Sequence, residues 1–258
     1  MEKDVVTYEL EGRVALIGLN RPEKRNALSL DLLHGLAEAV GRAAEEADAG
    51  VLFGHGPVFS GGLDLAELAR RISSAPAKPV RRERNKWHEV FDLIDRGTIP
   101  FVAALHGATI GGGLELASAA HIRVADPTTF FALPEGQRGI FLGGGGTVRI
   151  QKIIGYHAMA DMMLTGRVIS AAEGRELRVV QYLVEPGQAL AKAKDIATRI
   201  TQNTQQTNWQ ITNVLPRIGE LSHDDGLFME HINTAMARHP ETLERLKEFL
   251  EKRADRLV

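Results

Sequence analysis

The chain has 258 residues, of which 44% are hydrophobic and 25% are charged, a usual composition for a globular protein with a hydrophobic core. Its formal net charge of −2 at pH 7 argues against an overall basic surface for nucleic acids or anionic membranes. The absence of cysteine excludes disulfide bonds, a cysteine nucleophile and thiolate metal ligands.

The first half of the chain alternates between strand-like and helix-like segments. Residues Val5–Leu10 and Arg13–Leu19 are rich in β-formers and flank Glu11-Gly12, which predicts a β-hairpin. Ser29 is placed to cap a helix whose apolar residues follow a helical spacing, namely Leu32, Leu33, Leu36, Val40 and Ala43. Further strands are predicted at residues 50–53, 100–105, 122–125 and 129–132, and a helix around residues 87–94. This alternation indicates an α/β core.

The second half changes character after Leu183. Four segments have helical patterns, at residues 188–201, 207–219, 224–237 and 241–255. We therefore expect a core over residues 1–187, which carries the site, and a helical region over residues 188–258. Residues 71–86 contain two prolines and several basic side chains, and we interpret them as a mobile surface segment.

The N-terminal residues give no sign of export or of membrane insertion. They lack a basic segment that leads into an apolar one, as a signal peptide requires. No apolar stretch of the chain reaches the roughly 20 residues that a membrane-spanning helix needs. We therefore expect a cytoplasmic protein without membrane or nucleic-acid partners.

Three segments are rich in glycine: Ser60–Asp64, Gly107–Glu115 and Gly143–Thr147. The first two follow strand-like residues and precede helix-like ones, which places backbone N–H groups where they can bind negative charge. Tight turns and close packing are the better explanation for any one segment taken alone. Nucleotide binding fits poorly, because the third segment lacks the lysine of a P-loop and the second lacks the dinucleotide spacing. No Gly-x-Ser-x-Gly motif surrounds Ser60, which argues against a serine hydrolase.

Two acidic residues lie beside these segments in apolar surroundings. Glu115 occurs in the helix-like start Leu114–Ala117, and Glu135 follows Pro134 after an apolar run. A buried carboxyl group has a raised pKa, which suits it to acid–base chemistry. The alternatives are a charge that stabilises a helix N-terminus, for Glu115, and a surface charge in a loop, for Glu135.

Several motifs, in this order and spacing, resemble the enoyl-CoA hydratase/isomerase (crotonase) family. They are Leu19–Leu28, Val58–Leu65, Gly107–Leu116, Leu133–Thr147, Leu164–Ala171 and Phe249–Arg253. The resemblance implies the crotonase (ClpP-like) fold, an α/β spiral of ββα repeats followed by a helical C-terminal region that forms trimers. It therefore implies a homotrimer or a hexamer built as a dimer of trimers.

The same resemblance assigns roles to particular residues. Glu115 and Glu135 correspond to the two catalytic acids, and the N–H groups of Leu63 and Gly112 correspond to the oxyanion hole. The residues that correspond to contacts with CoA are Lys24, Arg25, Ala27, Ser60, Gly61, Asp64, Leu65, Gly143 and Lys252. We expect no metal and no separate cofactor, because CoA is part of the substrate and the thioester itself acidifies the α-carbon.

The sequence departs from the family pattern at two positions. Leu63 stands where a smaller residue is common, and Arg178 stands where glycine is frequent. Because Leu63 needs to supply only its N–H group, we expect the chemistry to be kept and the pocket to be narrower.

The implied reaction is that of a hydro-lyase, which adds water to a 2-enoyl-CoA and yields a 3-hydroxyacyl-CoA. Double-bond isomerisation, hydrolysis, decarboxylation and retro-aldol cleavage are the alternatives within the family. A catalytically silent CoA-binding scaffold is the alternative outside enzymes. The presence of both glutamates favours hydration.

Overall fold

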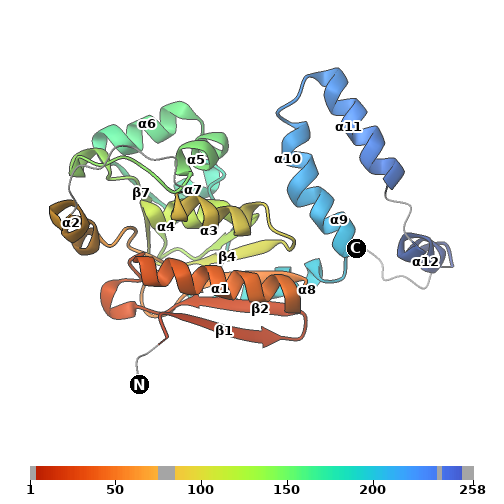
Figure 1. Cartoon of the computed structure of the whole chain (residues 1–258), viewed down its shortest axis with the longest axis horizontal. Helices are drawn as coiled ribbons and strands as arrows, with labels where there is room; N and C mark the ends of the chain where they lie inside the picture. Colours follow the sequence, from red (N-terminus) through yellow and green to blue (C-terminus); the bar gives the residue numbers. More distant parts are fainter. Residues whose placement is uncertain (1–3, 75–84, 237–239, 252–258) are drawn as a thin grey trace.

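The computed structural model describes residues 4–74, 85–236 and 240–251. Figure 1 shows a sheet covered by helices, with the last helices standing to one side of this body. No helix among the residues so described is long and apolar enough to span a lipid bilayer.

The larger of two sheets has six strands. They are β1 (Val6–Glu11), β2 (Val14–Leu19), β3 (Ala49–Gly54), β4 (Phe101–Leu105), β6 (Ile122–Ala125) and β9 (Tyr182–Leu183). Their order is β1-β2-β3-β4-β6-β9. Strands β1 and β2 form the predicted antiparallel hairpin, with Glu11 opposite Val14, and the remaining pairs are parallel.

The smaller sheet contains β5 (Ala108–Ile110), β7 (Phe130–Ala132) and β8 (Val168–Ser170), in that order. Strand β4 continues into β5, and β6 continues into β7, so the chain passes twice from the larger to the smaller sheet. Bridges between Leu28 and Leu63 and between Ser60 and Thr109 extend this second layer towards the N-terminus. The chain therefore follows the predicted spiral of ββα units.

Helices follow these strand pairs and cover the sheets. They are α1 (Leu30–Glu46), α2 (Leu65–Ser74), α3 (Lys86–Asp95), α4 (Gly112–Ala119), α5 (Gly146–Ile154), α6 (Tyr156–Thr165) and α7 (Ala171–Glu176). Ser29 caps α1 as predicted, because its Oγ accepts a hydrogen bond of 3.2 Å from the N–H of Leu32. Residues 71–86, which we expected to form a mobile surface segment, are exposed at both described ends, but residues 71–74 are the end of α2 and Lys86 begins α3. Residues 75–84 lie outside the described part.

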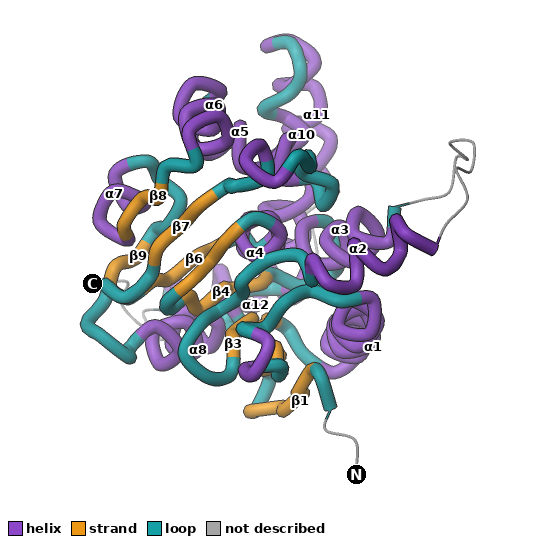
Figure 2. The backbone as a smooth tube through the Cα atoms, turned by 90° about the vertical axis from the view of Figure 1, so that its left-hand side faces the viewer, coloured by secondary structure: helices purple, strands orange, loops and turns teal. Residues whose placement is uncertain are grey.

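Alternation along the buried strands creates two hydrophobic cores. In β2, Ala15, Ile17 and Leu19 belong to the core beneath α1, α3 and α4, whereas Val14 and Leu16 belong to the core on the other face. Helix α8 (Ala189–Ile200) fills this second core, so α1 and α8 cover opposite faces of the sheet (Figure 2).

The C-terminal helices continue beyond α8. They are α9 (Gln205–Trp209), a π-helical turn (Gln210–Val214), α10 (Leu215–Ile218), α11 (His223–Met236) and α12 (Pro240–Leu250). The division into residues 1–187 and 188–258 stays a prediction. The packing of α8 against the sheet favours a boundary after Ile200.

Arg178, which stands where the family resemblance led us to expect glycine, adopts a left-handed backbone conformation with φ of 64°. It lies on the surface between α7 and the buried residues Val179 and Val180. A residue with a Cβ atom pays about 1–2 kcal/mol in this conformation. The position therefore stores local strain.

We predict that Arg178→Gly stabilises the protein by about 0.5–1 kcal/mol, because relief of this strain exceeds the extra entropy of glycine in the unfolded chain. Arg175→Gly is the matched control, since Arg175 is also exposed but lies within α7. It should destabilise the protein by about 0.5–1 kcal/mol. Urea unfolding of both variants measures the difference, and shifts of the same sign would contradict the prediction.

Candidate active site

Two backbone segments approach each other so closely that side-chain carbons do not fit between them. A Cβ atom on Gly62 would lie 2.5 Å from the carbonyl oxygen of Ile110. A Cβ atom on Gly113 would lie 2.7 Å from the carbonyl oxygen of Ser60. The two glycines therefore bring the segment around Leu63 against the start of α4.

The N–H groups of Leu63 and Gly112 are not used by the elements beside them. The bridge between Leu28 and Leu63 uses the N–H groups of Leu28 and Asp64, which leaves the N–H of Leu63 out of the pairing. Gly112 is the first residue of α4, and the N–H groups of a first helical turn have no acceptor within their helix. Both donors are thus available to a ligand oxygen.

Glu115 lies in the first turn of α4, a helix in which every residue is buried. Only 3% of Glu115 is exposed, and its Oε1 accepts hydrogen bonds of 2.8 Å and 2.9 Å from the N–H groups of Gly144 and Gly146. Burial raises the pKa of this carboxyl, while the two N–H groups and the charge of Arg149 oppose the rise. The surroundings therefore stabilise Glu115 as a carboxylate more than burial alone would allow.

Glu135 follows β7 and Pro134, and 6% of it is exposed. Its Oε1 lies against Gly111, where an added Cβ atom would be 2.3 Å away. Its Oε2 is buried and has no hydrogen-bond partner in the described part of the chain. Burial, followed by the charge of Glu115, raises the pKa of Glu135 to about 7, although its own backbone N–H opposes the rise.

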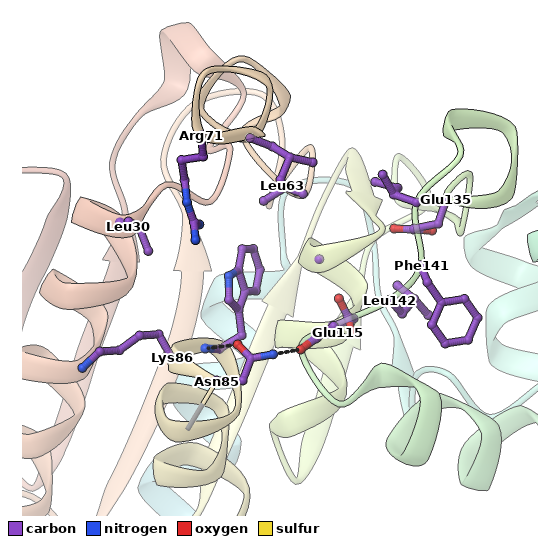
Figure 3. Close-up of a pocket in the computed structure, with 15 residues that line it drawn as sticks. Leu30, Leu63, Arg71, Asn85, Lys86, Glu115, Glu135, Phe141 and Leu142 are labelled. Atoms are coloured by element: carbon purple, nitrogen blue, oxygen red, sulfur yellow. Dashed lines mark hydrogen bonds between the residues drawn. The ribbon is translucent and has the colours of Figure 1, made fainter. Parts of the chain in front are cut away.

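Both glutamates border a cavity of about 390 Å³. Its lining consists of Leu30, Leu63, Leu68, Arg71, Asn85, Lys86, Trp87, Gly112, Glu115, Glu135, Ile140, Phe141, Leu142, Gly143 and Gly144. In Figure 3 the two glutamates lie on one side of the cavity and Leu30 and Arg71 lie on the other. The cavity thus joins two acids, an apolar wall and two N–H groups that have no hydrogen-bond acceptor among the described residues.

The described residues that the resemblance assigns to CoA binding lie in the loop that carries Lys24, Arg25 and Ala27 and in or next to the two glycine-rich segments that contain Gly61 and Gly143. Lys24 and Arg25 are exposed, and the N–H of Gly61 donates to the carbonyl of Arg25 at 2.8 Å. Ala27 is half-buried in the same loop, and Leu65 is exposed at the start of α2. Gly143 lines the cavity. Lys252 lies outside the described residues.

Two of these residues have structural contacts of their own. Ser60 is fully buried, and its hydroxyl donates to the carbonyl of Asn26 at 2.8 Å, so it can support the loop but cannot touch a ligand. The carboxylate of Asp64 accepts hydrogen bonds from Arg21 at 3.2 Å and from the N–H of Glu67 at 3.1 Å. It therefore fixes the start of α2 beside the cavity.

The sequence reasoning missed three residues that shape the site. Asn26 is fully buried with φ of 51°, and its Nδ2 donates to the carbonyls of His55 and Val58 at 2.9 Å. Its position after Arg25 was a usable signal, because asparagine tolerates positive φ in turns. Asn85 donates to the carbonyl of Gly143 at 2.6 Å. Trp87 stands 3.0 Å from where a Cβ atom of Gly112 would be, and nothing in its local sequence predicts this.

Within residues 4–74, 85–236 and 240–251, no group of three or more histidine, aspartate or glutamate side chains is placed to hold a metal ion. His106, which borders the second glycine-rich segment, contacts the carbonyl of Gly56 through its Nε2 at 2.9 Å. It therefore has a structural partner, as expected for a histidine outside a metal site.

Comparison with known proteins gives a consistent result. A family model described as enoyl-CoA hydratase/isomerase matches residues 9–256. A short-chain-enoyl-CoA hydratase of Clostridium acetobutylicum is 32% identical over 206 residues, which cover 79% of this chain and 77% of that protein.

Solved structures agree with this match. A crystal structure from Rhodopseudomonas palustris has 43% sequence identity and a TM-score of 0.87, and the match covers 96% of this chain and 95% of that one. An enoyl-CoA hydratase from Thermoplasma volcanium has 30% identity and a TM-score of 0.86, with 96% and 98% covered. The fold predicted from the sequence is therefore confirmed.

The raised pKa of Glu135 has a consequence for stability. Between pH 4.5 and about 7 the unfolded chain loses this proton while the folded protein keeps it, so stability falls as the pH rises through this window. The variant Glu135→Gln does not titrate there. We predict that its unfolding free energy rises relative to wild type by about 2–3 kcal/mol between pH 5 and pH 8.

Denaturant unfolding of wild type and Glu135→Gln at several pH values gives this difference. The exposed Glu38 of α1 provides a matched control, because Glu38→Gln should change stability equally at both ends of the window. A difference for Glu135→Gln that does not vary with pH would mean that Glu135 titrates as an ordinary carboxyl.

Proposed function

The chain belongs to the enoyl-CoA hydratase/isomerase family, and we propose that it is an enoyl-CoA hydratase that adds water across the C2=C3 bond of a 2-enoyl-CoA. The observation that carries the proposal is the presence of two buried carboxyl groups beside two free backbone N–H groups at one cavity. We also propose a cytoplasmic location, with which the lack of cysteine is compatible.

The first part of the proposed mechanism concerns the thioester oxygen. We propose that it accepts hydrogen bonds from the N–H groups of Leu63 and Gly112. Negative charge collects on this oxygen when the enolate forms, so fixed donors stabilise the transition state more than the substrate. One such donor typically contributes about 10²–10³ in kcat. The close packing of Gly62 on Ile110 supports the rigidity that this role requires.

The second part concerns the proton transfers. We assign Glu115 as the base that takes a proton from water while the water oxygen bonds to C3. We assign Glu135 as the acid that gives its proton to C2. The two N–H groups on Glu115 favour its ionised form against the effect of burial, and the pKa of about 7 at Glu135 leaves a large share of this group protonated at neutral pH. A proton passed from Glu115 to Glu135 through water then restores the starting state.

Binding of CoA is proposed for the loop that carries Lys24, Arg25 and Ala27, together with Gly61, Asp64, Leu65 and Gly143, and for Lys252. The exposed basic side chains of Lys24 and Arg25 support contacts with phosphate groups. Ser60 supports this loop from beneath through its hydrogen bond to the carbonyl of Asn26.

Double-bond isomerisation is the second candidate within the family. Isomerisation needs one base that carries a proton between two carbons, whereas hydration needs a base and an acid. The unequal surroundings of Glu115 and Glu135 favour hydration, because burial raises both pKa values but only Glu115 has the N–H groups of Gly144 and Gly146 to favour its ionised form.

We also propose that the chain assembles with copies of itself into a trimer or a hexamer. Helix α11 exposes Leu227, Phe228, Ile232 and Met236, and α12 exposes Leu243, Leu246, Phe249 and Leu250. These residues recur every three or four positions and form a stripe on each helix. Figure 1 shows both helices apart from the sheet, so the core of the same chain does not cover the stripes. Burial of each large side chain stabilises an assembly by about 1.5–3 kcal/mol.

The hydratase proposal predicts the effect of removing each charge. Glu115→Gln and Glu135→Gln keep the side-chain volume, and each should lower kcat for hydration of crotonyl-CoA by about 10²-fold or more. The losses should not add in the double variant, because the two groups serve one cycle of proton transfers. Binding of the thioester should change little, because neither carboxyl contacts the CoA moiety in the proposed complex.

Product analysis by mass spectrometry and hydration kinetics measure these effects, with Glu38→Gln as the exposed control. Isomerase activity replaces the proposal if the Glu115 variant still isomerises a 3-enoyl-CoA at full rate. A wild-type protein that binds CoA thioesters without converting them is a scaffold. Unchanged hydration in both glutamate variants rejects the two-acid mechanism.

The assembly proposal predicts that a charge within the stripe of α11 weakens the oligomer. Phe228 is 68% exposed in the single chain, so Phe228→Asp should shift the mass measured by light scattering from a trimer or hexamer towards a monomer. The exposed Glu230 of the same helix is the control, and Glu230→Ala should leave the mass unchanged. A wild-type protein that is monomeric at micromolar concentration contradicts the proposal.

A further inference from the structure

Arg149 contacts the glycine-rich loop from the side opposite to Glu115. It lies within α5, one turn after the loop, and only 12% of its side chain is exposed. Its Nη2 donates a hydrogen bond of 2.5 Å to the carbonyl of Gly144. A Cβ atom on Gly145 would lie 2.6 Å from the same Nη2, so the guanidinium packs directly on the loop backbone.

The directions of three successive peptide groups connect Arg149 with Glu115. The N–H of Gly144 points to Oε1 of Glu115, the carbonyl of Gly144 points to Arg149, and the N–H of Gly146 points again to Oε1 of Glu115. The carbonyl of Gly144 belongs to the middle peptide group, which joins the two peptide groups that carry the donors. The bond from Arg149 holds this middle group in place and thereby restrains the backbone on which both donors to Glu115 lie.

Helix α3 holds the guanidinium in this position. Nη1 of Arg149 lies 3.5 Å from the carboxylates of both Asp92 and Asp95, and the ring of Phe91 lies 5.9 Å from the guanidinium carbon. A planar guanidinium can contact a carbonyl and two carboxylates at the same time, which an ammonium group cannot do with the same geometry.

We propose that Arg149 is the positioning residue of the site, which keeps Glu115 in the orientation and charge state needed to activate water. This inference rests on the proposed hydratase function for its rate measurements. Arg149 itself does not reach the reacting atoms, since the loop backbone lies between it and Glu115. Its effect is therefore indirect, through the two N–H groups and through its positive charge.

The charge of Arg149 also determines the pH dependence. The charged or titratable groups that face Glu115 are His88 from α3, Glu135 from the loop after β7, and Arg149 from α5, with Asp92 and Asp95 behind Arg149. Arg149 and His88 lower the pKa of Glu115 against the effect of burial. Loss of Arg149 should therefore raise this pKa, and the acidic limb of the kcat profile should move to higher pH.

The first experiment compares Arg149→Ala and Arg149→Lys with wild type. Arg149→Ala should lower kcat by about 10–100-fold, since small errors in the position of a catalytic group have effects of this size. KM should stay near its wild-type value, because Arg149 contacts Gly144 and Gly145 and not the residues proposed to bind CoA. Arg149→Lys should recover part of kcat and return the acidic limb towards wild type, because it restores the charge without the planar fork.

Lys152 provides the matched control. It lies one turn further along α5, it is 59% exposed, and its ion pair with Glu220 does not involve the loop. Lys152→Ala removes the same charge from the same helix and should leave kcat, KM and the acidic limb unchanged. An equal effect of both variants would show a general charge or stability effect and would overturn the inference.

A second cavity permits a direct test by chemical rescue. It has a volume of about 430 Å³ behind the loop, and Asp92, Asp95, Arg149, Lys152, Asn213 and Glu220 contribute to its lining. Guanidinium ion at low millimolar concentration can enter this cavity when the side chain of Arg149 is absent. It should then increase kcat of Arg149→Ala several-fold, whereas sodium chloride at the same ionic strength should not.

Two outcomes reject the inference directly. One is an Arg149→Ala variant with wild-type kcat and an unshifted acidic limb. The other is a loss of kcat that neither lysine nor guanidinium ion restores although the variant unfolds at the wild-type temperature. If Arg149→Ala does not fold, Arg149→Lys provides the test. The inference then requires that this variant has a kcat below wild type and an unchanged KM.

A stability measurement separates this inference from the proposed function. If wild type hydrates no 2-enoyl-CoA, the hydratase proposal fails. The energetic coupling between Arg149 and Glu115 can still be measured from protein stability. The unfolding free energies of Arg149→Lys, Glu115→Gln and the double variant should be non-additive. Additive effects would show that Arg149 does not act on Glu115, whatever the protein catalyses.

Discussion

The site depends on how closely two pieces of backbone can approach. The segment at Gly62 and the start of α4 meet where carbonyl oxygens occupy the places that Cβ atoms would need. This contact sets the relation between the N–H groups of Leu63 and Gly112, because Leu63 follows Gly62 directly and Gly112 lies between Ile110 and Gly113. It also sets the position of Glu115, which lies one helical turn beyond it. A side chain at either glycine would separate the two donors and move the acid with them.

A second constraint makes two chemically identical side chains, Glu115 and Glu135, differ in their hydrogen bonding. Glu115 and Glu135 are both buried, so burial alone would raise both pKa values in the same way. The difference comes from the backbone. Two N–H groups meet one oxygen of Glu115, whereas Oε2 of Glu135 has no donor among the described residues. Carboxyl groups of one kind can thus take different protonation states within one cavity.

Much of the fold could be predicted from local patterns. The hairpin at Glu11-Gly12, the cap at Ser29 and the buried strands carry strong short-range signals, and all are present. The short strands β5, β8 and β9 were missed, because two or three residues form a strand only when distant partners supply the hydrogen bonds. Residues 71–74 were not recognised as helical, although their helix begins at Leu65 beside Asp64, whose carboxylate accepts a hydrogen bond from the N–H of Glu67.

Residues of the site could be predicted only where they lie within recognisable sequence motifs. Glu115 and Glu135 could be found as acids in apolar surroundings, but the sequence could not show that they differ in hydrogen bonding, since the two donors to Glu115 lie about thirty residues away. Arg149 reads as an ordinary basic residue on an amphipathic helix. Its role depends on Asp92 and Asp95 of another helix and on the direction of one carbonyl, and none of these has a signature in the sequence.

Helix α3 links the wall of the substrate cavity to the support of the acid. Trp87 on its first turn faces the cavity and stands against Gly112, and Asp92 and Asp95 further along hold Arg149. Helix α3 has ten residues, and a helix of this length is stiff. A displacement of its first turn therefore also displaces its last turn. An acyl chain that displaced Trp87 would move Asp92 and Asp95 with it. The contacts of these two residues with Arg149 would then change, and with them the support of Glu115. The shape of the cavity wall and the support of Glu115 thus depend on one and the same helix.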